Sequence, residues 1–335
     1  MKLHVSSSPH VGSKLTTQKI MLHMCIALLF PTVAGVIIFG LYSLVVVLTA
    51  VVSAVLAEML YNKMTHTRLT INDLSAVVTG MILGLNLPPS VPLYVPVVGS
   101  VFAIMLVKML FGGIGRNFAN PAATARLFLV LSWAAPMRAY MQPLDYSRGF
   151  WEAFLSGFTK QYVTSATPLA ALKTSGATGV LPDSINLLDL FLGRIGGSIG
   201  EVCAIAILLG FVYLMVFKII DWKIPTIYLL ACVLSALLMY NNGWLFVLPT
   251  LLSGGLLFGA VYMLTDYSTS PNTLIGKIIF AAGAGIFTVL FRSFSGFDGG
   301  VSIAILLMNL VVPLLDKIVP KPFGYKKPNK EEACA

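Results

Sequence analysis

The sequence predicts an all-α integral membrane protein with about ten transmembrane helices, and two observations carry that prediction. The 335-residue chain is 57% hydrophobic and only 10% charged, with a mean hydropathy of +0.89, whereas soluble domains carry roughly 25% charged residues. Apolar runs near the length of one membrane span, roughly 20 residues, recur along the chain. Because so few charges cannot cover a solvated surface, we expect one membrane domain rather than several soluble ones.

The apolar runs define the predicted elements. The predicted spans are 20–40, 41–60, 74–88, 92–111, 120–136, 195–217, 225–240, 244–264, 275–292 and 299–318. The resulting segments are a cytoplasmic N-terminal segment (1–19), a first membrane half (20–136), a long extracytoplasmic loop (137–194), a second membrane half (195–318) and a cytoplasmic tail (319–335). Residues 1–19 lack the arrangement of a signal peptide, so we expect the first span to be retained.

The distribution of basic residues predicts that both termini are cytoplasmic. If the N-terminus is cytoplasmic, the connectors after the second, fourth, sixth and eighth spans and the C-terminal tail also face the cytoplasm. Those connectors hold Lys63, Arg68, Arg116, Lys218, Lys223 and Lys277. The short outward turns PPSVP, YNNG and RSFSGFDGG together contain one Arg and no Lys. This is the positive-inside bias of membrane proteins, and it explains the net charge of +9 without a nucleic-acid partner.

A weak internal repeat relates the two halves. GMILG at 80–84 recurs as GLLFG at 255–259, and FGGIG at 111–115 is echoed by FDGGV at 297–301. Five spans per half would make two inverted five-helix repeats, an arrangement typical of channels and transporters. Short glycine motifs also arise by chance in apolar chains, so both interpretations stay open.

Two polar stretches at cytoplasmic membrane edges are candidate binding sites. Asn117 and Asn120 are spaced to share a helix face, and a helix starting at Pro121 would offer free N–H groups to an oxygen-rich ligand. Alternatively, Asn120 is only a helix cap. Asp266 is one of few acids near a membrane edge and could serve an ion path or a ligand. Equally, Ser270 could cap a helix beginning at Pro271, with Asp266 adding favourable charge.

The other chemistry-bearing residue types give fewer indications. Arg126 and Glu201 lie in or near apolar runs, where an ionisable group is costly, and we expect each to have a partner. The four cysteines and four histidines show no metal-ligand spacing. The stretch TSATPLAALKTSGATG (164–179) offers an accessible threonine hydroxyl among small residues in an outside loop, or it is simply a turn.

Taken in order, three motifs make the chain resemble the family of the D subunits of Rnf electron-transport complexes, which are ion-translocating ferredoxin:NAD+ oxidoreductases. These motifs are NFANPAATARLF (117–128), TSATPLAALK (164–173) and TDYSTSPNTLIGKIIF (265–280). The chain is more distantly similar to the B subunit of sodium-translocating NADH:quinone reductase. The resemblance covers nearly the whole chain and includes its multi-span apolar plan.

The resemblance implies a covalent FMN, joined through its phosphate to a loop threonine by a flavin transferase. It assigns Thr167, because the following Pro-Leu fits this family's version of the attachment motif. Ser165 stands where Gly is usual, and Gln161 where Asp is usual. Thr178, in SGAT, fits the generic core better but lacks the Pro-Leu continuation, and it remains the alternative. Lys160, Arg148 or Lys173 could offset the phosphate charge.

The resemblance further implies a second, non-covalent flavin, riboflavin, for which Asn117, Asn120 and Pro121 match the family's Asn-x-x-Asn-Pro pattern. It implies partners as well, namely the other subunits of the membrane complex, including a second FMN-bearing subunit. The expected location is the bacterial inner membrane. The alternatives to a redox subunit of such a translocase are a non-redox solute channel or transporter, suggested by the repeat, and a scaffold subunit with a vestigial motif.

Overall fold

The computed structural model describes residues 16–67, 69–145, 150–159, 163–164, 167–176, 182, 186–240, 243–294 and 300–318. Throughout these residues the regular structure is helical, and the single extended pairing is an isolated bridge between Met141 and Thr164. The predicted all-α class is therefore confirmed for the described part of the chain.

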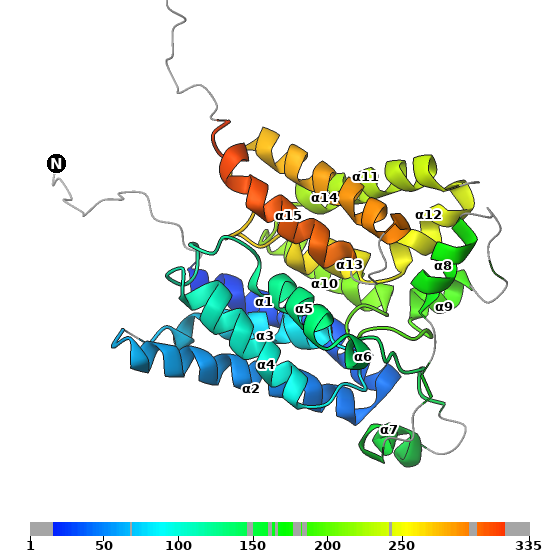
Figure 1. Cartoon of the computed structure of the whole chain (residues 1–335), viewed down its shortest axis with the longest axis horizontal. Coiled ribbons are helices and arrows are strands. Elements are labelled where there is room, and N and C mark those ends of the chain that lie inside the picture. Colours follow the sequence, from blue (N-terminus) through cyan, green and yellow to red (C-terminus); the bar gives the residue numbers. More distant parts are fainter. Residues whose placement is uncertain are drawn as a thin grey trace, which may run out of the picture.

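The first half contains two long helices followed by shorter ones (Figure 1). Its elements are α1 (Thr17–Phe39), α2 (Leu41–Met64), the 3-10 turn η1 (Ile71–Asp73), α3 (Ser75–Leu85), α4 (Tyr94–Val101) continuing as the π-helix η2 (Phe102–Met109), α5 (Pro121–Ser132) and α6 (Ala134–Met137). Gly40 separates α1 from α2 with φ +86°, and a Cβ there would lie 2.6 Å from the Phe154 carbonyl oxygen. Only glycine readily adopts this φ and also lacks the Cβ that would overlap with the carbonyl oxygen.

The second half also combines continuous helices with one broken helix. Its elements are α10 (Ala204–Val216), α11 (Lys223–Met239), α12 (Gly243–Leu252), α13 (Leu256–Phe258) continuing as the π-helix η4 (Gly259–Met263), α14 (Leu274–Phe294) and α15 (Gly300–Leu315). The predicted continuous span 244–264 is wrong in one respect, because the chain bends by 64° between Leu252 and Leu256. Gly254 and Gly255 make this bend with φ values of +62° and +70°.

Three short helices lie between the halves: α7 (Phe150–Thr159), α8 (Pro168–Gly176) and α9 (Leu187–Leu192). Helix α7 rests against α2, whereas α8 and α9 both contact α12, beside which Figure 1 shows them. The intervening segment therefore touches both membrane halves.

Helix length and composition mark a multi-pass membrane protein. Among the described residues, α1, α2 and α14 are long and apolar enough to cross a membrane, and the bent pair from Gly243 to Met263 is a fourth if it counts as one span. Large apolar side chains face outward along these helices, as at Leu29, Val33 and Ile37 of α1. The remaining predicted spans correspond to apolar helices of 10–17 residues, so the total of ten stays a prediction.

The helices of each half pack mainly on one another. In the first half α2 packs against α4, and in the second α11 packs against α14; likewise η2 packs on α5, and α14 on α15. Where the halves meet, α1 lies against α10 and α5 against α15.

Candidate functional site

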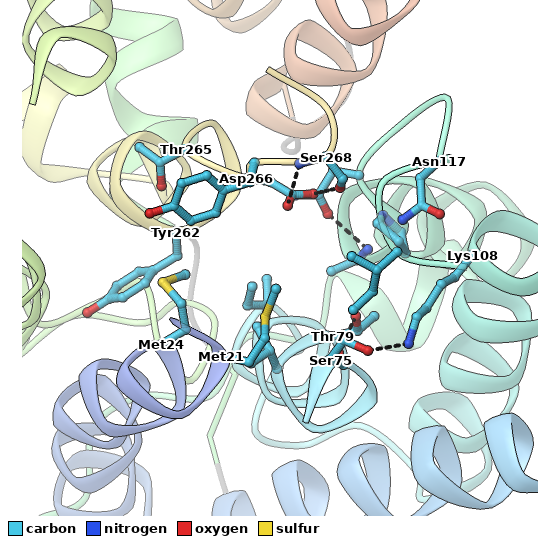
Figure 2. A pocket seen from close by; sticks show the side chains of 17 residues that line it. Met21, Met24, Ser75, Thr79, Lys108, Asn117, Tyr262, Thr265, Asp266 and Ser268 are labelled. Carbon is cyan, nitrogen blue, oxygen red and sulfur yellow. Dashed lines mark hydrogen bonds between the residues drawn. The ribbon is translucent and has the colours of Figure 1, made fainter. Parts of the chain in front are cut away.

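One pocket lies where α1, α3 and η2 meet the segments before α5 and after η4. We call it the Asn120 pocket; it encloses about 650 Å³, including its open mouth. Figure 2 shows Met21 and Met24 on one side and Asp266 and Ser268 on the opposite side. The pocket is lined by Met21, Met24, Ser75, Val78, Thr79, Ile82, Lys108, Ile114, Asn117, Asn120, Pro121, Ala122, Tyr262, Thr265, Asp266, Tyr267 and Ser268. An apolar wall with a few polar groups is typical of a ligand site.

Asn120 caps α5, as the alternative to a binding role predicted. Its Oδ1 accepts hydrogen bonds from the N–H groups of Ala122 (3.0 Å) and Ala123 (3.2 Å), and Pro121 occupies the first helical turn. Its Nδ2 donates to the Met263 carbonyl oxygen at 3.0 Å, so the side chain also joins the two halves. Asn120 is 3% exposed, and both ends of its amide are engaged within the fold.

Asn117 lies on the wall of the same pocket but differs in its bonding. Its Oδ1 is buried, and no hydrogen-bond donor among the described residues reaches it. A buried acceptor without a partner is costly, so Asn117 is the asparagine with capacity left for a ligand.

A buried ion pair on the pocket wall was not predicted from the sequence. Lys108 of η2 donates from Nζ to Glu58 Oε2 of α2 at 2.7 Å. It also donates to Ser75 Oγ at the start of α3, as Figure 2 shows. Thr70 Oγ1 donates to the other oxygen of Glu58 at 2.5 Å. Glu58 and Lys108 each lie inside a predicted apolar span, and that position was the signal for a pair.

Asp266 closes the opposite side of the pocket in the turn after η4. Its carboxylate accepts hydrogen bonds from the Ser268 N–H (3.3 Å), Ser268 Oγ (3.0 Å) and Thr269 Oγ1 (3.3 Å). Desolvation raises the pKa of Asp266 above its ordinary value, and the bonds from Ser268 and Thr269 oppose that shift. The expected helix start at Pro271 is wrong. Helix α14 begins at Leu274, where Thr273 Oγ1 accepts from the Gly276 N–H at 3.1 Å.

The second pocket, which we call the Thr167 pocket, opens beside the start of α8 and encloses about 390 Å³, including its mouth. It is lined by Arg126, Tyr140, Thr167, Pro168, Leu169, Ile195, Gly196, Gly197, Ser198, Glu201, Val202 and Gly254. Thr167 is half-buried, and its Oγ1 accepts a long hydrogen bond of 3.4 Å from the Ala170 N–H, as a helix cap does. Ser165, Lys160, Arg148, Gln161 and Thr178 lie outside the described residues.

Arg126 and Glu201 meet in this pocket and are each other's ion-pair partner. Arg126 Nη1 donates to Glu201 Oε1 and, at 2.7 Å, to Asn86 Oδ1. The prediction that each ion has a partner is confirmed. The sequence did not indicate that they pair with each other, since they are 75 residues apart. A Cβ at Gly255 would overlap with the Glu201 carboxylate, so the bend between α12 and α13 leaves room for this pair.

Arg292 lies behind the same bend. The sequence placed it where the predicted span 275–292 meets the turn RSFSGFDGG; it is in the last turn of α14 and is 2% exposed. Its Nη1 donates to the Thr250 carbonyl oxygen at 2.7 Å, and its Nη2 donates to those of Ser253 (2.9 Å) and Gly254 (2.8 Å). Arg292 therefore satisfies carbonyls that the broken helix leaves open.

Comparison with known proteins agrees with the motifs. The model of the NQR2, RnfD, RnfE family matches residues 4–324. The D subunit of the Na(+)-translocating ferredoxin:NAD(+) oxidoreductase complex of Acetobacterium woodii is 43% identical over 99% of this chain and 98% of its own. The D subunit of the proton-translocating ferredoxin:NAD(+) oxidoreductase complex of Clostridium ljungdahlii is 37% identical over 96% of each chain.

A further relative gives the same result. The D subunit of the ion-translocating oxidoreductase complex of Escherichia coli K12 is 35% identical over 98% of this chain and 100% of its own. These matches run over nearly the full length of every chain compared. The chain therefore belongs to the NQR2, RnfD, RnfE family.

Proposed function

We propose that this chain is the membrane-embedded D subunit of an ion-translocating ferredoxin:NAD+ oxidoreductase complex, in which a covalent FMN on Thr167 relays electrons coupled to Na+ or H+ transport. The observation that carries the proposal is the near full-length identity of 35–43% to subunits of that name. The subunit works as part of a multisubunit translocase, and we do not expect activity from the isolated chain.

The surroundings of Thr167 fit a phosphate-linked group. The hydroxyl belongs to a half-buried residue at the rim of a pocket, directly before a helix. Helix N-termini favour anions, because their N–H groups and dipole point at the ligand. Arg126 adds a buried guanidinium on the pocket wall. When bound, the flavin supplies the electron-transfer chemistry, while the protein supplies position and surroundings.

The Asn120 pocket fits the second, non-covalent flavin, riboflavin. Its methionine and isoleucine side chains give an apolar wall for a flat ring, and Asn117 Oδ1 offers an acceptor to a ring N–H. Asn120 would hold the pocket's shape through its bond to the Met263 carbonyl oxygen rather than bind the ring itself. Asp266, on the opposite side, is our candidate for the ion path.

The proposed architecture has ten spans in two inverted five-helix repeats, both termini in the cytoplasm and residues 137–194 outside the bacterial inner membrane. The packing of α1 on α10 and of α5 on α15 supports the repeat, because equivalent helices meet at the interface between the halves. In this topology the Asn120 pocket opens on the cytoplasmic side and the Thr167 pocket on the outer side. The partners are the other subunits of the complex, including a second FMN-bearing subunit, and a flavin transferase during maturation.

Single threonine variants test the attachment site. When the native complex is denatured and its subunits are separated on a gel, this chain should run as a fluorescent flavin band. Thr167→Ala should abolish this fluorescence, and Thr178→Ala should retain it. Fluorescence that survives Thr167→Ala would overturn the assignment. A chain without flavin in any variant would favour the alternative suggested by the repeat, a channel or transporter, which should pass its solute when reconstituted alone.

A further inference from the structure

We propose that the Thr167 pocket is a phosphate site, in which Arg126 Nε and Ser198 Oγ donate hydrogen bonds to the non-bridging oxygens of a phosphodiester carried by Thr167. This inference rests on the proposed function, since the phosphodiester is the link between Thr167 and FMN. It adds the residues that hold the link in place, which neither the motif nor the relatives' names identify.

The pocket wall carries two buried donors that the fold does not use. Arg126 Nε and Ser198 Oγ have no hydrogen-bond partner among the described residues, although Arg126 is 5% and Ser198 1% exposed. Both residues line the same pocket as Thr167. An unpaired buried donor is costly, and two such donors lining one pocket indicate a ligand with at least two acceptor oxygens. A phosphodiester has two free oxygens.

The charges beside the pocket match the same ligand. Arg126 and Glu201 neutralise each other, and both line the pocket. Arg292 adds a positive charge behind Gly254, where a Cβ would lie 3.1 Å from Arg292 Nη2 and 3.0 Å from Leu169 Cδ2. The three buried groups therefore sum to one positive charge, and a phosphodiester carries one negative charge. A cation would instead be repelled by this net positive charge.

The backbone around the pocket leaves space for an anion. Gly196, Gly197 and Gly254 line it without side chains, and the first turn of α8 lies on the same wall as Thr167. The N-terminal end of α8 adds partial positive charge. Glycine at these positions allows close approach of a phosphate to the backbone.

The test compares how much flavinylation stabilises matched variants of the full chain in its complex. Each complex is produced with and without the flavin transferase, intact mass verifies attachment, and thermal unfolding gives the rise in Tm on flavinylation. Ser198→Ala removes one donor. Arg126→Lys keeps the charge opposite Glu201 but removes Nε. Ser302→Ala is the control, because its hydroxyl is also buried and unpaired among the described residues but does not line the pocket.

We expect flavinylation to raise the Tm of the wild type and of Ser302→Ala equally, and to raise that of Ser198→Ala and Arg126→Lys by less than half as much. An equal rise in all four complexes would overturn the phosphate site while leaving the flavin on Thr167, and the pocket would then hold only water. Absence of any mass gain would instead overturn the proposed function, and the phosphate site with it.

Discussion

At the scale of single residues, the polar side chains in the apolar body show which ones serve the fold and which keep capacity for a ligand. Glu58, Lys108 and Glu201 are paired and buried. Three other buried atoms have no hydrogen-bond partner among the described residues: Arg126 Nε, Ser198 Oγ and Asn117 Oδ1. Arg126 and Ser198 line the Thr167 pocket, and Asn117 lines the Asn120 pocket. The other unpaired buried atoms of the described residues, on Thr250, Ser253, Arg292 and Ser302, line neither pocket, so an unpaired atom marks a candidate site only where it also lines a pocket.

Removal of one partner from the buried Arg126–Glu201 pair should be far more costly than removal of one partner from the partly exposed Asp221–Lys277 pair. Glu201→Ala leaves Arg126 buried and uncompensated, and we expect a loss of about 3–5 kcal/mol in the free energy of unfolding. Asp221→Ala opens the pair of Asp221 with Lys277, whose side chains are 31% and 24% exposed, and should cost less than about 1 kcal/mol. Denaturant unfolding of the purified chains gives both values; equal losses would contradict the buried pairing.

The Asp221–Lys277 pair should also make stability depend on pH. Burial alone would raise the pKa of Asp221, but the hydrogen bond from Lys277 at 2.9 Å, with the nearby N–H and positive charges, lowers it below its ordinary value of 3.8. A lowered carboxyl pKa stabilises the fold above pH 3.8, and this contribution is lost as the pH falls through the folded-state pKa. Lys277→Met should therefore lower the Tm at pH 7 but not at a pH below that pKa. A Tm difference that persists in acid would contradict this origin.

At the scale of elements, hydropathy located the helices but not their breaks. Each predicted span contains an apolar helix, because apolar runs are visible in the sequence. The bend at Gly254 and Gly255 depends on Arg292 satisfying carbonyls from 38 to 42 residues away, and no local pattern reveals such a contact. For the same reason the sequence indicated that Arg126 and Glu201 each have a partner but not that they pair with each other, whereas the cap at Asn120 was predicted locally as one alternative.

The bend itself can be tested by adding a methyl group. Gly255→Ala should be strongly destabilising, because φ is +70° and the Cβ would overlap with the Glu201 carboxylate. Gly113→Ala is the matched control, since φ is +88° but nothing lies within 4 Å of the added Cβ. The control should cost on the order of 1–2 kcal/mol from the left-handed backbone alone. Equal losses of Tm in the two variants would show that the Arg126–Glu201 pair does not lie against the bend.

At the scale of the whole molecule, the proposed topology predicts which surfaces face each side of the membrane. Leu188 of α9 is 68% exposed in the proposed outer segment, and Lys63 is exposed at the proposed cytoplasmic end of α2. In intact cells, a membrane-impermeant maleimide should label Leu188→Cys, and it should label Lys63→Cys only after permeabilisation. The native chain, with its own cysteines, is the background control. The reverse labelling pattern would refute the proposed orientation.

The proposed electron relay depends on FMN being attached to Thr167, and peptide mapping of the native complex decides this point. We expect the peptide containing Thr167 to be heavier than calculated by the mass of FMN less one water, with the addition on that threonine. Recovery of this peptide, and of the peptide containing Thr178, at their unmodified masses would contradict the proposed role of the chain.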